Sequence, residues 1–482
     1  MSYPREYYLG SGFTKQTFWS SSVKRDIIVA VVTMVLAAVL AFTRHVYAPL
    51  VVMGVGAAVI GVMHVGAHAG VSLGDRGVFR LMAGISRLGG IGRFTRIGVP
   101  WFARDIDVCA QTPQGMDNPG GATPEVAVQL LLPAGVSFKV QRSALATTVV
   151  GLGGSFAGLD DWAVLNGQAR MFGALQVAAG NPRWGIKQID FATRISPADL
   201  SGQAVWDNNH GGGSEAGEMR AIVGADATKV ESWLAITCQP RPQRGSEWLD
   251  AMCDGAWDTT VEIVRQARAA GLNPYRVLSP RRLAATWRSL LYPERQAGDM
   301  DGIDGPWSGV PGLETTTVAV TTSTGWWHSI AVIDKNGWPQ ERVGPDFLDP
   351  LLGTIPAAPY RLVVTQLGMM SRREAQDKAR TAGAVAGASL LAEEKASDFT
   401  TGETRLRVAG AESMLDELLA HGVGTLPVLR VMVSARSLDE LMMARQAVRE
   451  TLDMMSFTGE YWCDGWQARA LGGMMLMGRG LK

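Results

Sequence analysis

The sequence predicts an α+β protein in which an N-terminal transmembrane helical hairpin precedes a cytoplasmic mixed α+β body with ferredoxin-like strand-helix units. Three observations predict this fold. Two long apolar runs follow one another near the N-terminus, separated by a short polar tip. Beyond residue 125, segments of strand period alternate with segments of helix period. Only 19% of the 482 residues are charged against 47% hydrophobic, which is typical of a membrane segment joined to a soluble body.

The two apolar runs cover residues 27–42 and 46–66. A spanning helix needs about 17 to 25 apolar residues, so the second run is long enough. The first run reaches this length with Thr43, because Lys24 and Arg44 can extend to the two interfaces. A cleaved signal peptide would show a single shorter run, and a buried hairpin of a soluble protein would show a polar stripe. Two antiparallel spans are therefore favoured over both alternatives.

Basic residues flank the two spans and set their orientation. Cations precede the first span and follow the second, whereas the tip carries Arg44 alone. The positive-inside rule then places both termini in the cytoplasm. The excess of Arg over Lys and the abundant Gly and Ala indicate a bacterium, so we expect the inner (plasma) membrane. The predicted membrane-flanking residues are Lys24, Arg25, Arg44, Arg76, Arg80 and Arg87. Arginines between 76 and 96 alternate with apolar residues, so we expect this stretch to contact anionic lipid, with DNA as the alternative.

The charge balance and the cysteines exclude several classes of protein. There are 45 Lys+Arg against 45 Asp+Glu, so we predict no binding of nucleic acid through an overall field and no direct sequence-specific binding. A mean hydropathy of +0.07 excludes a long disordered chain. The four cysteines are far apart and form no C-x-x-C pair, which predicts neither a disulfide framework nor a zinc site. Free thiols indicate a reducing compartment.

Composition divides the chain into five segments. They are a cytoplasmic head at 1–26, the transmembrane hairpin at 27–66, a basic juxtamembrane segment and linker at 67–124, an α+β subdomain at 125–300, and a second α+β subdomain at 301–482. Within the last segment, residues 372–421 have a helical pattern. This stretch is either a hairpin packed on the sheet or a contact arm for a partner.

Periodicity predicts the individual elements. Strands are predicted at 126–132, 186–195, 231–238, 361–366 and 429–434. Helices are predicted at 161–178, at 247–270, from 372 onward, and at 438–454 behind an N-cap at Ser437. Residues 97–124 are rich in Pro and Gly and are predicted to be irregular, as is the loop 208–217. Repeated strand-helix succession with short links makes ferredoxin-like layering the simplest arrangement.

Catalytic motifs are absent or incomplete. The Gly-rich stretch 151–158 lacks the Lys of a phosphate-binding loop, and Asp160 and Asp161 are predicted to cap a helix. Cys253 and Cys463 each begin a Cys-Asp-Gly triplet, but no base that would activate the thiol can be identified. We therefore predict no catalytic residue, no cofactor and no bound metal. A membrane-tethered hydrolase using Asp160, Asp161 or a thiol is the enzymatic alternative.

Trp326, Trp327 and His328 form an aromatic cluster in a strand-like run. Such a cluster could stack a ligand. Core or interface packing is the favoured interpretation, because large aromatic rings contribute most of their free energy through burial.

Several stretches resemble components of conjugative secretion. The polar head, the two-helix hairpin and the Arg-rich stretch after it resemble the PrgI-like component of Gram-positive type IV secretion. Four C-terminal stretches resemble the N-terminal, non-ATPase domain of conjugative traffic ATPases: PDFLDPLLG at 345–353, the strand and helix at 360–378, LRVMVSARSLDELMMARQAVRE at 429–450, and LGGMMLMGRGL at 471–481. Together they resemble an actinobacterial conjugation-associated membrane protein family.

This resemblance implies a structural and coupling component of a conjugative type IV secretion apparatus in the inner membrane. In traffic ATPases the last stretch leads into the ATPase domain, whereas here the sequence stops at Lys482, so a separately encoded ATPase is expected to dock. The implied partners are the lipid bilayer, the traffic ATPase, channel subunits and further copies of the chain. The resemblance implies no catalytic residue. The alternatives are a type VII secretion membrane component (EccE-like) and another membrane-anchored scaffold.

Overall fold

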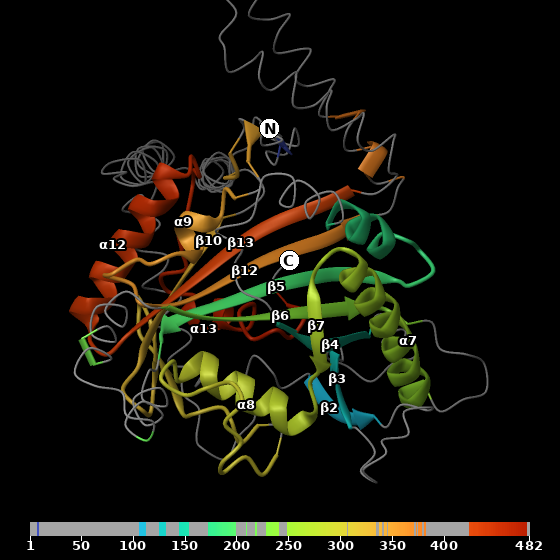
Figure 1. The fold of residues 1–482 in the computed structure, drawn as a ribbon, viewed down its shortest axis with the longest axis horizontal. Coiled ribbons are helices and arrows are strands. Elements are labelled where there is room, and N and C mark those ends of the chain that lie inside the picture. The colour runs from blue at the N-terminus through green and yellow to red at the C-terminus, as the bar shows by residue number, and fades with distance from the viewer. Residues whose placement is uncertain are drawn as a thin grey trace, which may run out of the picture.

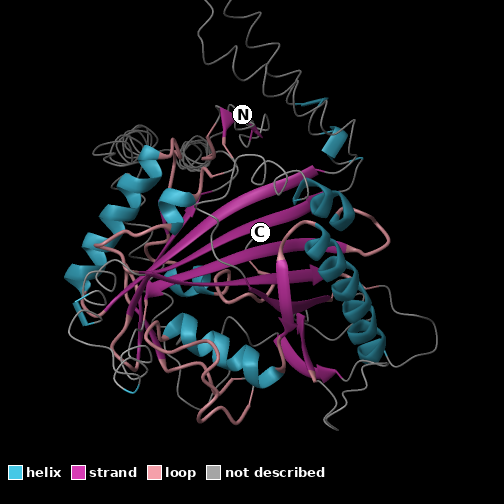
Figure 2. Cartoon of the chain, viewed as in Figure 1, coloured by secondary structure: helices cyan, strands magenta, loops and turns pink. Residues whose placement is uncertain are grey.

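The computed structural model contains one large antiparallel β-sheet with a few helices on its faces (Figures 1 and 2). The structure describes residues 7–8, 106–111, 125–131, 144–153, 172–198, 228–240, 248–305, 307–333, 337–339, 342–344, 346–370 and 424–479, with short pieces at 209, 217–218, 373, 375–377 and 380–381. The predicted hairpin at 27–66 lies outside these ranges. So do the predicted flanking residues Lys24, Arg25, Arg44, Arg76, Arg80 and Arg87. Each helix within the described ranges is too short or too polar to cross a membrane.

Twelve strands build the main sheet. In chain order they are β2 (Ile106–Gln111), β3 (Val126–Leu131), β4 (Leu145–Gly153), β5 (Ile186–Pro197), β6 (Thr228–Cys238), β7 (Asn273–Val277), β8 (Leu313–Thr315), β9 (Val320–Thr322), β10 (Trp327–Ile333), β12 (Tyr360–Met370), β13 (Gly424–Ala435) and β14 (Tyr461–Trp462). Their spatial order is β2-β3-β4-β6-β5-β12-β13-β10-β9-β8, and β7 and β14 pair with β4 and β10. A separate two-stranded sheet joins β1 (Tyr7–Tyr8) to β11 (Arg342–Val343).

In the described part of the chain, five helices with defined ends accompany the sheet. They are α7 (Trp248–Ala269), α8 (Pro280–Leu291), α9 (Asp349–Leu352), α12 (Leu438–Met454) and α13 (Gln467–Leu471). Residues 172–179 are also helical. Side chains alternate between the two faces of each strand, so β5 shows which helices share a face. Its Ile189 packs in the core beneath α7 and its Ile195 in the core beneath α12, whereas Ala192 packs on the α8 and α13 side.

The predicted mixed α+β body with ferredoxin-like strand-helix units is wrong. The local succession exists, since β6 leads to α7 and β13 leads to α12. However, β6 lies between β4 and β5, β13 lies between β12 and β10, and all of these neighbours are antiparallel. The order of elements along the chain therefore did not determine which strands pair. The predicted division into two subdomains at residue 300 stays a prediction. β5, which precedes residue 300, pairs directly with β12, which follows it.

Most predictions based on local period are confirmed. The five predicted strands correspond to β3, β5, β6, β12 and β13, and the predicted helix at 438–454 is α12. The N-cap is also confirmed, because Ser437 Oγ accepts a hydrogen bond from Glu440 N at 3.2 Å. The prediction that 97–124 is irregular is wrong where β2 forms, and α8 was not predicted. Short length and flanking Pro and Gly conceal β2 in the sequence.

Candidate protein-docking site

α12 is an amphipathic helix that lies on the same face of the sheet as α7, at the opposite end (left side of Figure 1). Its Leu441, Ala444, Val448 and Leu452 are fully buried against apolar side chains of β10, β12 and β13. These positions recur at intervals of three and four residues, so they form one stripe along the helix. α12 is thereby fixed to the sheet along its inward face.

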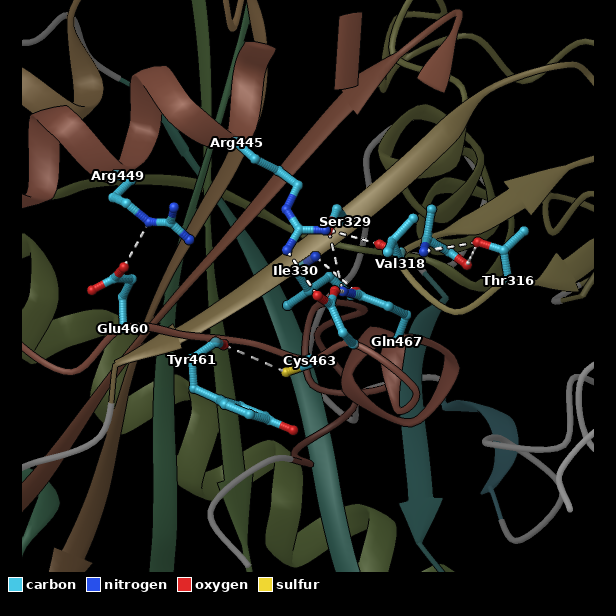
Figure 3. Close-up of polar contacts among 12 residues, drawn as sticks. Thr316, Val318, Ser329, Ile330, Arg445, Arg449, Glu460, Tyr461, Cys463 and Gln467 are labelled. Carbon is cyan, nitrogen blue, oxygen red and sulfur yellow. Dashed lines mark hydrogen bonds and ion pairs between the residues drawn. The ribbon is translucent and has the colours of Figure 1, made fainter. Parts of the chain in front are cut away.

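The two arginines of α12 reach the segment that follows the helix (Figure 3). Arg445 is buried, donates to Asp464 Oδ2 at 3.0 Å and lies 4.5 Å above the ring of Trp462. Arg449 donates from Nε to Glu460 Oε1 at 2.9 Å. Both cations on the helix are therefore neutralised from inside the molecule.

The turn at residues 463–467, which contains Asp464, is hydrogen-bonded to β10 (Figure 3). Gln467 is fully buried at the start of α13, accepts from Ile330 N at 2.8 Å and donates to Ser329 Oγ at 3.1 Å. Cys463 N donates to Ile330 O at 2.9 Å. Hydrogen bonds at both ends of this turn therefore fix it to the sheet. We call the turn at 463–467 together with β10 the platform of α12.

Breaking the buried ion pair is expected to cost more than breaking the more exposed one. Arg445→Met should lower the free energy of unfolding by about 2 kcal/mol, because it leaves Asp464 without its partner and removes the contact with Trp462. Arg449→Met should cost less than about 1 kcal/mol, since Arg449 is 31% exposed. Urea unfolding of the full chain in detergent micelles, followed by tryptophan fluorescence, compares the two. Equal losses would show that Arg445 contributes no more than an ordinary surface pair.

The outward face of α12 has a different character. Its exposed residues are Leu438, Asp439, Glu440, Met442, Met443, Gln446, Glu450, Asp453 and Met454. Four are acidic, four are large and apolar, and none is basic. Met454 is 76% exposed and Met443 is 58% exposed. Four of the six most exposed large hydrophobic residues in the described part of the chain lie on this one helix.

A second polar assembly lies on the opposite face of the sheet, where six adjacent strands each contribute buried polar side chains. We call it the polar row; its members are Gln129, Thr147, Thr237, Gln188, Asp190, Gln366 and Arg430. Register aligns them: Gln129 is opposite Thr147, Thr147 opposite Thr237, and Thr237 opposite Gln188. Asp190 is opposite Gln366, and Arg430 Nε donates to Gln366 Oε1 at 2.7 Å.

The polar row binds the chain's own C-terminal segment, residues 472–479. Gln129 Nε2 donates to Leu476 O at 3.1 Å, and Gln366 Nε2 donates to Gly473 O at 3.2 Å and to Arg479 O at 2.8 Å. From α8, Trp287 Nε1 donates to Met475 O at 2.8 Å. Residues 474–477 (MMLM) are almost completely buried between α8 and the sheet. The polar row therefore supplies hydrogen-bond donors to main-chain carbonyls of the same chain.

Asp190 is the one carboxyl group in this row. It is buried, and its Oδ1 accepts from Gln188 Nε2 at 2.6 Å. Burial raises its pKa to about 7, although the hydrogen bond from Gln188 and the nearby charge of Arg430 act in the opposite direction. Its Oδ2 has no hydrogen-bond partner among the described residues. Asp190 therefore keeps its proton to a higher pH than an exposed aspartate does.

The two cysteines that the sequence singled out do not share a site. Cys253 lies within α7, whereas Cys463 lies in the turn after β14, so the two Cys-Asp-Gly triplets occupy unrelated structures. Burial raises the pKa of Cys463 to about 12, and the pKa of Cys253 is raised by a hydrogen bond with Cys109 and by burial. Both thiols are protonated at neutral pH, which is the opposite of an activated nucleophile. Asp160 and Asp161 lie outside the described residues.

The aromatic cluster is part of the core. Trp326 is buried, lies edge-on to Tyr360 at 5.0 Å and is covered by the guanidinium of Arg436 at 4.3 Å. His328 is completely buried and bonds Ser434 Oγ through Nδ1 at 2.8 Å. Burial lowers its pKa to about 4, so the ring is neutral. The interpretation as packing is confirmed for Trp326 and His328.

Sequence reasoning missed the polar row, although a signal exists. Gln129, Thr237 and Gln366 are polar residues inside or at the end of apolar runs, at positions that alternation assigns to a buried face.

No family model matches the chain, and no curated protein matches it.

Proposed function

We propose that this protein is a non-enzymatic structural and coupling component of a conjugative type IV secretion apparatus, and that it docks a separately encoded traffic ATPase. The outward face of α12 carries this proposal. It combines exposed methionines with acidic side chains that form no ion pair with a described residue, whereas the inward face of the same helix is packed on the sheet. Exposed methionines on a rigid support are typical of surfaces that bind other proteins.

The location in the cell follows from the sequence. The two apolar runs at 27–42 and 46–66 would anchor the chain in the inner membrane, with both termini in the cytoplasm. α12 would then face the compartment in which a traffic ATPase works. The resemblance of residues 345–353 and 429–450 to the non-ATPase domain of such enzymes supports the choice of partner.

A docking role also agrees with the state of the thiols. Covalent catalysis by Cys253 or Cys463 requires a thiolate, and burial disfavours that form in both residues. The resemblance carries over no catalytic residue.

Gene deletion with purification from native cells tests this function. We expect deletion to abolish plasmid transfer and the tagged full chain to recover a hexameric ATPase or a channel subunit from detergent-solubilised membranes. Transfer at the wild-type frequency, or recovery of neither subunit, would reject the proposal. Recovery of type VII secretion components in their place would favour the EccE-like alternative.

A further inference from the structure

We propose that the outward face of α12 binds a basic amphipathic helix of the partner. This inference rests on the proposed function and adds the chemistry of the docked segment. It is drawn from three features of α12: the spacing of its exposed apolar residues, the sign and position of its exposed charges, and the fixed platform beneath it.

The exposed apolar residues share a face with the exposed acids. Met443, Glu450 and Met454 follow one another at intervals of seven and four residues, so they lie on one line along the helix. Met442 and Asp453 lie beside this line. A partner helix that crosses this face would meet Met443 and Met454 with the Glu450 carboxylate between them, and Met442 with Asp453 to one side. Flexible methionines adapt to such a helix, and an amphipathic helix places its apolar residues at the same three- and four-residue intervals.

The positions of the acids are not explained by the stability of α12. Asp439 and Glu440 lie in the first turn, where negative charge favours the helix dipole. Glu450 and Asp453 lie near the C-terminus, where negative charge is unfavourable, and the last turn contains no basic residue. Glu450 accepts only from the neutral Gln446 among the hydrogen bonds of α12, at 2.8 Å. These two acids therefore complement a cation that the helix itself does not supply.

The platform fixes this face before a partner arrives. Arg445 and Arg449 are paired with Asp464 and Glu460, so both arginines of the helix already have a carboxylate partner outside it. Gln467 ties the same turn to β10. A surface that is already ordered loses little conformational entropy on binding. Net negative charge on it selects arginine or lysine on the partner and disfavours acidic segments and anionic lipid.

Photocrosslinking in donor cells tests the chemistry of the partner segment. A photoreactive amino acid replaces Met443 or Met454 in the full chain, and mass spectrometry identifies the crosslinked peptide. We expect a peptide of the ATPase or of a channel subunit that carries arginines or lysines on one face and apolar residues on the other. The control replaces Val261, which is 48% exposed on α7, and should not capture this peptide.

Charge reversal separates binding from folding. Glu450→Lys with Asp453→Lys should lower the crosslinking yield at Met443 at least tenfold. The same double variant should keep or raise the thermal unfolding midpoint, because lysine near a helix C-terminus is favourable. Asp258→Lys on the exposed side of α7 is the matched control and should leave the yield unchanged.

The possible results of these experiments distinguish the basic-helix inference from the proposed function. An acidic or uncharged peptide, a second copy of this chain, a lipid adduct, or an unchanged yield in the double variant would overturn the basic-helix inference. If the ATPase or a channel subunit still copurifies in that case, the proposed function stands. A basic amphipathic peptide from a protein outside the secretion apparatus would support the inference and reject the proposed function.

Discussion

Gly478→Ala is expected to destabilise the protein far more than Gly459→Ala. Both glycines have a φ of +66°, so each alanine incurs the same penalty of about 1 to 2 kcal/mol for the left-handed region. They differ in the space around them. A Cβ at Gly459 meets nothing within 4 Å, whereas a Cβ at Gly478 comes within 2.5 Å of Thr147 Oγ1 and closer still to Thr237 Oγ1.

The clash at Gly478 cannot be relieved locally. Thr147 and Thr237 are hydrogen-bonded to each other across neighbouring strands at 2.9 Å, so neither hydroxyl can move without losing that bond. The alternative is to lift residues 472–479, which exposes Met475 and Leu476 and leaves Gln129 and Gln366 without their carbonyl partners. One buried side chain contributes about 1.5 to 3 kcal/mol, and one unsatisfied buried group costs about 1 to 3 kcal/mol. We expect a loss of about 5 kcal/mol.

Urea unfolding of the full chain in detergent measures this difference. The midpoint for Gly478→Ala should fall well below that for Gly459→Ala, and tryptophan fluorescence should include a contribution from Trp287, whose Nε1 donates to Met475 O. Equal midpoints for the two variants would show that the C-terminal segment is not held as described. The left-handed φ of +56° at Leu476 supports the expectation, since surrounding contacts must maintain it.

The contrast between α12 and the polar row shows what the sequence could and could not predict. α12 was predicted with its ends and its cap because the Ser437 cap and the apolar stripe act within a few residues. The polar row brings Gln129 beside Thr147 and Asp190 beside Gln366, and that proximity depends on strand register across the whole sheet. Register is set by pairing between distant segments, which local period does not contain.

The wrong fold class has the same physical cause. Period identified β6 and β13 and the helices behind them, but ferredoxin-like layering was inferred from their order along the chain. The strands instead pair with β4, β5, β10 and β12 in one antiparallel sheet. The acids of α12 were visible in the sequence, yet only the inward pairing of Arg445 and Arg449 shows that no cation of the helix balances them.

Asp190→Asn is expected to remove a component of stability that falls as pH rises. Below about pH 4 the carboxyl is protonated in the folded and the unfolded chain, so it adds no pH dependence. Between about pH 4 and pH 7 the unfolded chain releases the proton and the folded chain keeps it, because burial raises the folded pKa to about 7. Stability contributed by this group therefore decreases through that window and is constant above it.

The expected size follows from the same shift. Each pH unit of the window corresponds to about 1.4 kcal/mol, so the wild type should lose roughly 4 kcal/mol from Asp190 between pH 4 and pH 8. Asparagine has the same shape and no charge, and its carbonyl oxygen can still accept from Gln188 Nε2. Asp190→Asn should therefore match the wild type near pH 4 and exceed its unfolding midpoint at pH 8.

Asp299→Asn provides a control of opposite sign. The pKa of Asp299 is lowered by the backbone N–H of Asp301 and by Arg288 and Arg295, so its contribution is lost only as pH falls below about 4, and this variant should run parallel to the wild type from pH 4 to pH 8. The urea midpoint of the full chain is measured from pH 4 to pH 8. The midpoint of Asp190→Asn should rise above that of the wild type as pH increases. A parallel pH profile for Asp190→Asn would mean that Asp190 is ionised in the folded protein, with Arg430 and Gln188 outweighing its burial.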